Sequence, residues 1–177
     1  MWVGAPRRGA PAPTSSLQRS LYARRVRIGL VSDTHGLLRP ALLEFLRGSD
    51  HIVHAGDICD QSVLERLGAI APLTAVRGNN DVGVWAGRLR ETELLDVAGV
   101  RLFVIHDLAQ LGTLASDARA TVVVSGHSHK PLVKRESGRL FVNPGCAGPR
   151  RFKLPISAGD LVIEGGEVTP RLVQFEA

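Results

Sequence analysis

The sequence lacks the features that mark membrane proteins and disulfide-rich secreted proteins. No apolar run approaches the ~18 residues that a bilayer-spanning helix needs. Only two of the 177 residues are cysteines, Cys59 and Cys146, and they form no CxxC pair, so no disulfide framework is expected. We therefore expect a protein of a reducing compartment, located in the cytoplasm and without a membrane partner.

Four common functional signatures are also missing. The chain contains no GxGxxG, no GxxxxGK[ST], no GxSxG and no HExxH. The usual sequence evidence for dinucleotide binding, a P-loop, a serine-hydrolase elbow or a zinc protease helix is therefore absent.

Most of the chain has almost no net charge, although the formal total is +5. Residues 1–32 hold six of the 22 basic side chains and no acidic one, which leaves 16 basic and 17 acidic side chains in the rest. The basicity belongs to one end of the chain, so a specific nucleic-acid partner is not expected.

The amino-terminal segment reads differently from the remainder. We expect residues 1–24 to form a disordered basic leader, because this Pro-, Ser- and Arg-rich stretch offers little apolar surface to bury. It lacks the apolar core of a secretory signal. Its composition also resembles an organellar transit peptide, with a natural extension or a misassigned start as the preferred alternatives. Residues 25–177 are long enough for one domain with its own core.

Strand and helix patterns alternate after the leader. We expect strand–helix alternation in the first half to give parallel pairing, and hairpins in the second half to give a mixed or second sheet. The expected helices span 40–47, 61–70 and 108–118, the last capped by Asp107. The expected strands span 26–32, 51–55, 73–76, 91–97, 100–106, 121–125, 131–135, 139–142, 161–163 and 168–173.

Histidine, aspartate and asparagine residues follow the ends of several expected strands. Ligand sites in open α/β sheets form at the carboxyl ends of strands. If the backbone stays extended there, residues i and i+2 point the same way, and each DxH or HxH pair aims at one place. Glycines 56, 78 and 126 would permit unusual backbone angles beside them. The segments are Asp33-Thr34-His35, Gly56-Asp57, Gly78-Asn79-Asn80-Asp81, His106 and Gly126-His127-Ser128-His129.

This combination of imidazole, carboxylate and amide groups indicates metal binding. It suits Mn, Fe, Co, Ni or Zn and is too rich in nitrogen for Mg or Ca alone. One structural zinc needs four ligands, whereas the larger set found here fits two ions about 3.5–4 Å apart with a bridging carboxylate. A chance GHxH is expected only about 0.02 times in a chain of this composition. The candidate ligands are Asp33, His35, Asp57, Asn79, His106, His127 and His129.

The ordered set DxH, GD, GNxD, H and GHxH resembles the calcineurin-like metallophosphoesterase superfamily. The short length and the later Asn143-Pro144-Gly145-Cys146 segment resemble its small bacterial phosphodiesterase branch, the YfcE type. The resemblance runs from about residue 26 to the carboxyl terminus. It implies an α/β fold, a four-layer α/β/β/α sandwich of two mixed sheets flanked by helices.

The resemblance also implies how the ligands divide between two divalent ions, with manganese as our first choice. Asp57 would bridge the ions, and a hydroxide held between them would attack phosphorus in line, without a side-chain nucleophile. One ion would be held by Asp33, His35, Asp57 and His129, and the other by Asp57, Asn79, His106 and His127.

Three positions depart from the family pattern. Larger members often have histidine where this chain has Asn80, and an amide cannot serve as a general acid. Esters with acidic leaving groups are therefore the expected substrates. Asp107 stands where glycine is frequent, and we expect it mainly to cap the following helix. Cys146 stands where serine is frequent, and we expect it to line a turn.

Several further residues have two readings. Asp81 either orients a site group by hydrogen bonds or forms a turn. His51 and His54 are read as strand histidines outside the metal site. Arg77 is read as a surface ion pair rather than a phosphate contact. The run of residues 150–153, Arg-Arg-Phe-Lys, is read as a solvated basic turn, with a phosphate or nucleic-acid contact as the alternative.

The sequence thus predicts a two-metal phosphoesterase that acts on a small phosphodiester. The alternative is a non-catalytic scaffold of the same fold, of the retromer type, although such scaffolds have altered ligands. A nuclease like the double-strand-break repair members is a third reading, but those proteins carry additional domains. The oligomeric state stays open between a monomer and a small homo-oligomer.

Overall fold

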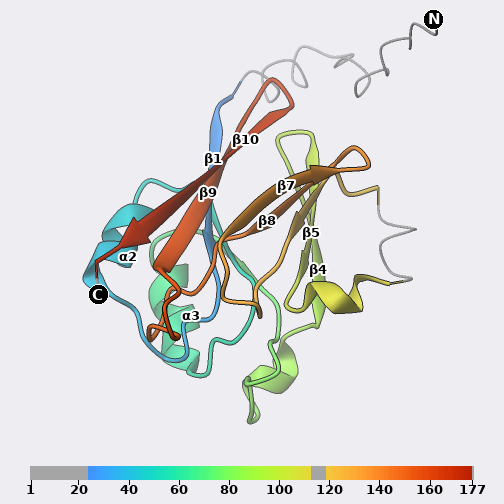
Figure 1. Ribbon diagram of the computed structural model, residues 1–177. Helices are drawn as coiled ribbons and strands as arrows, with labels where there is room; N and C mark the ends of the chain where they lie inside the picture. Colours follow the sequence, from blue (N-terminus) through green and yellow to red (C-terminus); the bar gives the residue numbers. More distant parts are fainter. Residues whose placement is uncertain (1–23, 113–118, 177) are drawn as a thin grey trace, which may run out of the picture.

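The computed structural model describes residues 24–112 and 119–176, which form two facing five-stranded sheets (Figure 1). The expected leader, apart from residue 24, lies outside the described residues. Within the described part, no helix has the length and apolarity that a membrane crossing requires.

The first sheet has the strand order β10-β9-β1-β2-β3. Strands β1, β2 and β3 pair in parallel, and two helices connect them, as the alternating pattern predicts. The long hairpin β9–β10 joins the other edge of β1 in antiparallel fashion. The elements are β1 (Val26–Val31), α2 (Pro40–Leu46), β2 (His51–His54), α3 (Gln61–Gly68), β3 (Leu73–Ala75), β9 (Ile156–Glu164) and β10 (Glu167–Phe175).

The second sheet has the order β4-β5-β6-β8-β7, in which β5, β6 and β8 run parallel and both edge strands are antiparallel. Both sheets are therefore mixed. The elements are η1 (Ala86–Arg88), β4 (Thr92–Val97), β5 (Val100–Ile105), η2 (Leu108–Leu111), β6 (Val122–Val124), β7 (Leu132–Glu136) and β8 (Arg139–Asn143).

Three two-residue turns close the hairpins at the predicted places. In each turn both central residues have positive φ, for example 48° at Ala98 and 79° at Gly99. Positive φ at both positions matches the twist of the adjoining strands, which is why such turns favour glycine. The other two turns are Ser137-Gly138 and Gly165-Gly166.

Three apolar clusters define the layers. The largest lies between the sheets and joins inward-facing residues such as Leu30 of β1 and Leu102 of β5. The second packs α2 and α3 on the outer face of the first sheet, where Figure 1 shows both helices. The third places η2 on the outer face of the second sheet, with Leu108 against Phe103 and its neighbours. The predicted α/β sandwich of two mixed sheets is confirmed.

Three expected elements differ from the structure. The segment expected as a helix over 108–118 begins as the short 3₁₀ helix η2, and residues 113–118 lie outside the described residues. The Asp107 cap itself is present, since its carboxylate accepts a hydrogen bond from Ala109 N at 2.9 Å. The last two strands are much longer than the expected 161–163 and 168–173.

Candidate metal centre

The ends of five strands bring all seven candidate ligands to one edge of the sandwich. Asp33 and Asp57 follow β1 and β2 of the first sheet, whereas His106 and His129 follow β5 and β6 of the second. The two sheets meet there, because His129 Nε2 lies 3.4 Å from Asp33 Oδ1 and His106 Nε2 lies 3.4 Å from Asp57 Oδ1.

One group of donor atoms, cluster 1, combines Asp33, His35 and His129. A ligand atom from each of the three lies within 4.8 Å of the others. The two imidazoles stack, with ring centroids 5.4 Å apart and an angle of 5° between the planes. His35 Nε2 is also 3.9 Å from Asp57 Oδ2, so Asp57 borders this cluster.

A second group, cluster 2, combines Asn79, His106 and His127. Asn79 Oδ1 lies 3.0 Å from both His106 Nε2 and His127 Nδ1, and these two nitrogens are 3.3 Å apart. Asp57 Oδ1 completes the group at 3.4 Å from His106 Nε2. Donors bound to one ion at ~2.1 Å lie about 3.0–3.4 Å apart, so these separations suit a shared cation.

The backbone of these loops corrects one expectation. Asp33, His35, His127 and His129 were expected in extended conformation, but their φ angles are 54°, 46°, 62° and 57°. Their side chains still converge because each loop turns sharply past its strand: Leu37 N donates to Thr34 O at 2.9 Å, and Ser128 N to Gly126 O at 2.7 Å. Left-handed backbone is unfavourable for non-glycine residues and concentrates at functional sites.

The neighbouring glycines are required mainly for space. Only Gly56 has a positive φ, of 91°. A Cβ on Gly78 would lie 2.2 Å from Asp57 N, and one on Gly126 would lie 1.9 Å from Ser32 Oγ. Two of the three glycines therefore let loops from different strands approach each other, and unusual backbone angles are not their purpose.

Cluster 1 contains polar atoms that have no partner. Asp33 Oδ1 and His35 Nε2 are buried and make no hydrogen bond with the described residues, and His129 Nδ1 shares this state. An unsatisfied buried polar atom costs about 1–3 kcal/mol. Two of these three atoms point into cluster 1, so a cation bound there would satisfy them.

The protonation of the site also fits a cation. Burial lowers the pKa of His35, and it lowers the pKa of His129 to about 4, so both rings are neutral at pH 7. Burial raises the pKa of Asp33 to about 6, and the charge of Asp57 adds to the effect. A divalent cation between these carboxylates would relieve the repulsion and favour their ionised forms.

Hydrogen bonds fix the tautomers of two central histidines. His106 Nδ1 lies 2.7 Å from Ala55 O, which can only accept, so Nε2 is free to face cluster 2. His54 is fully buried, its Nδ1 accepts from Gly56 N at 3.2 Å, and its Nε2 meets Thr34 Oγ1 at 2.9 Å. Burial lowers the pKa of His54 to about 3. His54 thus supports the loops, as expected of a strand histidine outside the donor set.

Asn80 and Asp81 both hold the Asp57 loop. Asn80 donates to both oxygens of Asp57, from its backbone N at 2.9 Å and from Nδ2 at 2.6 Å. Asp81 Oδ1 accepts from Ile58 N and Cys59 N, each at 2.7 Å, and Oδ2 accepts from Gly78 N at 2.7 Å. Of the two readings of Asp81, the structure supports the orienting one.

Sequence reasoning missed two neighbours of the donor set. Asn143 Nδ2 donates to Gly126 O at 2.6 Å and to Ser128 Oγ at 3.1 Å, so it supports the loop of His127 and His129. Asn143 belongs to the Asn-Pro-Gly-Cys segment that resembles the small phosphodiesterase branch, and this resemblance was the sequence signal that could have identified it. Cys59 Sγ lies 3.4 Å from His35 Nδ1, and only its position two residues after Asp57 hinted at this.

The other cysteine was expected to line a turn, but Cys146 is buried and forms an isolated β-bridge with Ile156. Cys146 Sγ donates to Asp33 O at 3.3 Å, and burial raises the pKa of its thiol. A thiol in this state is a poor nucleophile.

A cavity of about 320 Å³ opens beside cluster 2. Asn79, His106 and His127 line it together with several charged side chains. Arg77 is paired there with Glu91 at 2.6 Å, the expected ion pair. Asp107 lines the cavity as well as capping η2, with Oδ2 4.0 Å from His127 Nε2. A substrate could therefore reach the donor atoms from this side.

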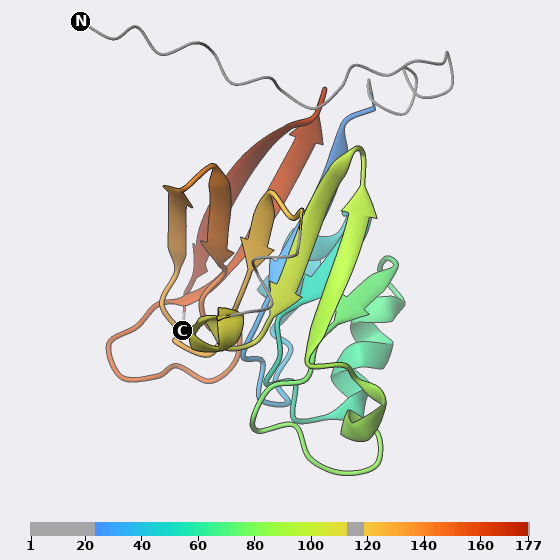
Figure 2. The same cartoon turned by 90° about the vertical axis from the view of Figure 1, so that its right-hand side faces the viewer.

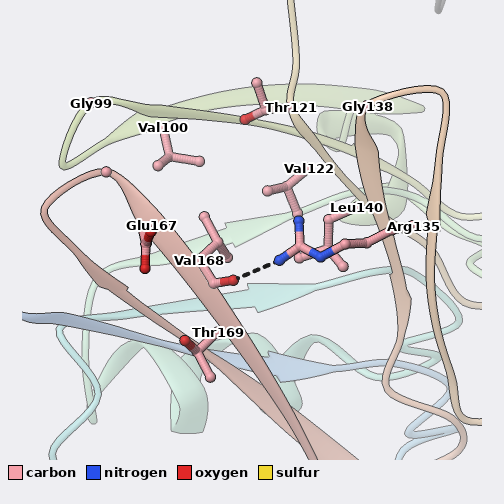
Figure 3. A pocket seen from close by; sticks show the side chains of 11 residues that line it. Gly99, Val100, Thr121, Val122, Arg135, Gly138, Leu140, Glu167, Val168 and Thr169 are labelled. Atoms are coloured by element: carbon pink, nitrogen blue, oxygen red, sulfur yellow. Dashed lines mark hydrogen bonds between the residues drawn. The ribbon is translucent and has the colours of Figure 1, made fainter. Parts of the chain in front are cut away.

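A hollow of about 500 Å³ lies at the opposite end of the strands (Figure 3). Val100 and Val168 line it near the start of β5 and β10, and Arg135 of β7 donates to Val168 O at 3.0 Å across the two sheets. It contains none of the candidate ligands, so the chemistry is concentrated at the other edge.

Comparisons with known proteins agree with this arrangement. The family described as the calcineurin-like phosphoesterase superfamily domain matches residues 26–166. A probable metallophosphoesterase of Methanothermobacter thermautotrophicus is 30% identical over 164 residues, or 85% of this chain and 93% of that protein. A phosphodiesterase of Methanocaldococcus jannaschii is 27% identical over 142 residues, or 70% of this chain and 86% of that protein. The crystal structure of Chaetomium thermophilum Vps29 matches with a TM-score of 0.75 at 18% identity, over 85% and 89% of the two chains, and shows the shared fold.

Proposed function

Because the chain belongs to the calcineurin-like phosphoesterase superfamily, we propose that it hydrolyses small phosphodiesters with two divalent metal ions. The observation that carries this proposal is the position of Asp57, whose two oxygens face two different donor clusters. Asp57 Oδ2 borders cluster 1 and Asp57 Oδ1 borders cluster 2. One carboxylate between two cations reduces their mutual repulsion.

The chain's own residues fit both ions. Asp33, His35 and His129 would hold one ion, Asn79, His106 and His127 the other, and Asp57 both. When bound, the ions supply an activated water and positive charge for in-line attack on phosphorus. The mixed oxygen and nitrogen donors suit manganese, our first choice, and also iron, cobalt, nickel or zinc.

The charges around the cavity favour a diester over a monoester. Glu91 and Asp107 line the cavity beside cluster 2, and its arginine, Arg77, is already paired with Glu91. A monoester dianion would be repelled more strongly there than a diester, which carries a single negative charge.

Asn80 limits the leaving groups that the protein can expel. Its amide donates to Asp57 and cannot deliver a proton to a departing alkoxide. Esters whose leaving group is already stable as an anion should therefore react fastest.

The test is hydrolysis of bis(p-nitrophenyl) phosphate with each candidate metal. We expect Mn²⁺-dependent activity, faster than with p-nitrophenyl phosphate, and a loss of roughly 100-fold or more in kcat/KM for Asp57→Asn and for His129→Ala. His51→Gln is the matched control, because His51 bonds Thr74 on the neighbouring strand and lies outside both clusters. An inert wild type with every metal, or ligand variants as active as the wild type, would refute the proposal.

The competing function is a non-catalytic scaffold of the same fold. Such a scaffold has no need to retain a full donor set, whereas this chain keeps all seven candidates within two clusters. Purified protein that binds no metal and acts only with a partner would favour the scaffold.

A further inference from the structure

We propose that residues 150–153, the cationic strip, bind a nucleotide, with the base of a phosphodiester substrate stacked on Phe152 and its phosphate beside Arg151. This rests on the proposed function and narrows its substrate class. The strip is the basic run for which the sequence favoured a solvated turn.

Backbone hydrogen bonds place the strip beside cluster 1. Ala147 N donates to Ser32 O at 3.0 Å, and Gly148 N donates to Asp33 O at 3.1 Å. Gly148 also packs so closely on Thr34 that a Cβ there would lie 2.2 Å from Thr34 O. The segment that leads into the strip is therefore fixed against the donor loop of β1. Figure 2 shows the loop between β8 and β9, in orange, projecting at the end of the sandwich that carries the β1 loop.

Arg151 brings a cation close to the loop that carries Asp33. It is exposed and lies three residues after Gly148, whose backbone N donates to Asp33 O. The planar donors of its guanidinium suit phosphate oxygens.

The positive charges of the strip have no internal partners. Among the described residues, the side chains of Arg150, Arg151 and Lys153 make no hydrogen bond or ion pair, in contrast to Arg77, which is paired with Glu91. Arg150 and Lys153 line a hollow of about 450 Å³ that also contains Phe175. The strip thus keeps three cations available for an anion from outside the chain.

Phe152 points its ring into water in the middle of these cations. It is 94% exposed, the most exposed large apolar side chain in the described part of the molecule. Its φ of 51° is unfavourable for a bulky residue. Such backbone strain at an exposed aromatic ring agrees with a functional position.

An aromatic ring flanked by cations matches the two chemical parts of a nucleotide. Bases of any sequence stack on aromatic side chains, and the phosphate pairs with arginine. One ring accommodates one base, so the strip fits a nucleoside-sized group rather than a long strand. A nucleotide diester also has the single charge that the cavity beside cluster 2 favours.

Two substrates with the same leaving group test the strip. Thymidine 5′-(p-nitrophenyl phosphate) carries a base, whereas methyl p-nitrophenyl phosphate carries none. Phe152→Ala should raise KM about fivefold or more for the thymidine ester and leave kcat and the methyl ester unchanged. Phe152→Tyr should keep the wild-type KM. Arg151→Gln should raise KM for both esters, since both carry the phosphate.

Leu94→Ala is the matched control, because Leu94 is 54% exposed on the edge strand β4, away from the strip. Equal effects of Phe152→Ala on the two esters, or none on either, would overturn the inference while leaving the phosphodiesterase proposal intact. Calorimetric binding of thymidine 5′-(methyl phosphate), a diester whose methoxide is a poor leaving group, tests the strip in Mn²⁺ buffer without turnover. Equal affinity of wild type and Phe152→Ala in that measurement would also overturn it.

Discussion

Asp81 shows how one carboxylate can fix the shape of the donor loops. It is buried, with 6% of its surface exposed, and accepts three backbone N–H groups from the loops after β2 and β3. Those loops carry Asp57 and Asn79, so Asp81 sets the spacing between the two residues without belonging to the donor set.

Asp81→Asn should therefore weaken both stability and metal binding. The new NH₂ group cannot accept, so at least one buried N–H loses its partner, at a cost of about 1–3 kcal/mol. We expect manganese affinity to fall about 10- to 100-fold, as measured by urea unfolding and metal titration. Asp60→Asn is the control, because Asp60 is an exposed cap of α3 and asparagine caps equally well. Identical behaviour of the two variants would contradict this role of Asp81.

At the residue scale, the sequence predicted which side chains form the candidate site but not the backbone conformation of those residues. The His, Asp and Asn series identified the residues that meet at the edge, because ligand types at strand ends are visible in sequence. The positive φ of Asp33 or His127 was not predicted, because Asp and His favour left-handed backbone only weakly and most of them adopt other conformations. That conformation is imposed by contacts with other loops, such as Asp33 N to Gly56 O.

Among the elements, the hairpin β9–β10 departs most from the sequence pattern. Residues 157–160 combine small and polar side chains with no strand alternation, yet all four are buried in β9. Gly159 is needed there because a Cβ would lie 2.8 Å from Arg171 O. Pairing with β1 on one side and β10 on the other overrides local preference. The parallel β1–β2–β3 unit and the glycine turns were predictable because their signals are local.

Asp160 should be the most sensitive side chain of this hairpin. It is fully buried and paired with Arg27 at 2.7 Å and with Arg171. Burial alone would raise the pKa of Asp160, but the hydrogen bonds from both arginines hold it below its usual value. Asp160→Asn should destabilise the protein by about 3 kcal/mol in urea unfolding, at the low end for a broken buried pair because Arg171 is largely exposed.

Asp96→Asn is the matched control for this measurement. Asp96 makes the same type of paired contact with Arg101, two bonds of 2.6 Å, but at the surface of the β4–β5 hairpin. Solvent screens such a pair, so little stability should be lost. Equal losses for the two variants would contradict a special role of the buried pair.

At the scale of the whole molecule, the donor atoms come from both sheets. Asp33, Asp57 and Asn79 follow strands of the first sheet. His106, His127 and His129 follow strands of the second sheet. An ion bound in either cluster therefore joins the two sheets and should stabilise the sandwich as a unit.

Manganese should accordingly raise the Tm. At about 100 times the Kd, a ligand that binds only the folded state contributes about 2.7 kcal/mol, which corresponds to a rise of about 5–10 °C for a domain of this size. Scanning calorimetry with Mn²⁺ and then with a chelator measures the shift and its reversal. His129→Ala should reduce the shift and His51→Gln should keep it. An unchanged Tm in the wild type would contradict binding across the sheets.

The three glycine-containing hairpin tips have a practical consequence. Gly99, Gly138 and Gly166 all border the hollow at the end of the strands that lacks the candidate ligands. Length changes at these tips leave the donor loops untouched, so they are natural places to graft a fluorescent reporter or an immobilisation tag. A sensor built on this chain can thus carry its label at the hairpin end of the sandwich, while the donor loops at the opposite end remain accessible to metal and substrate.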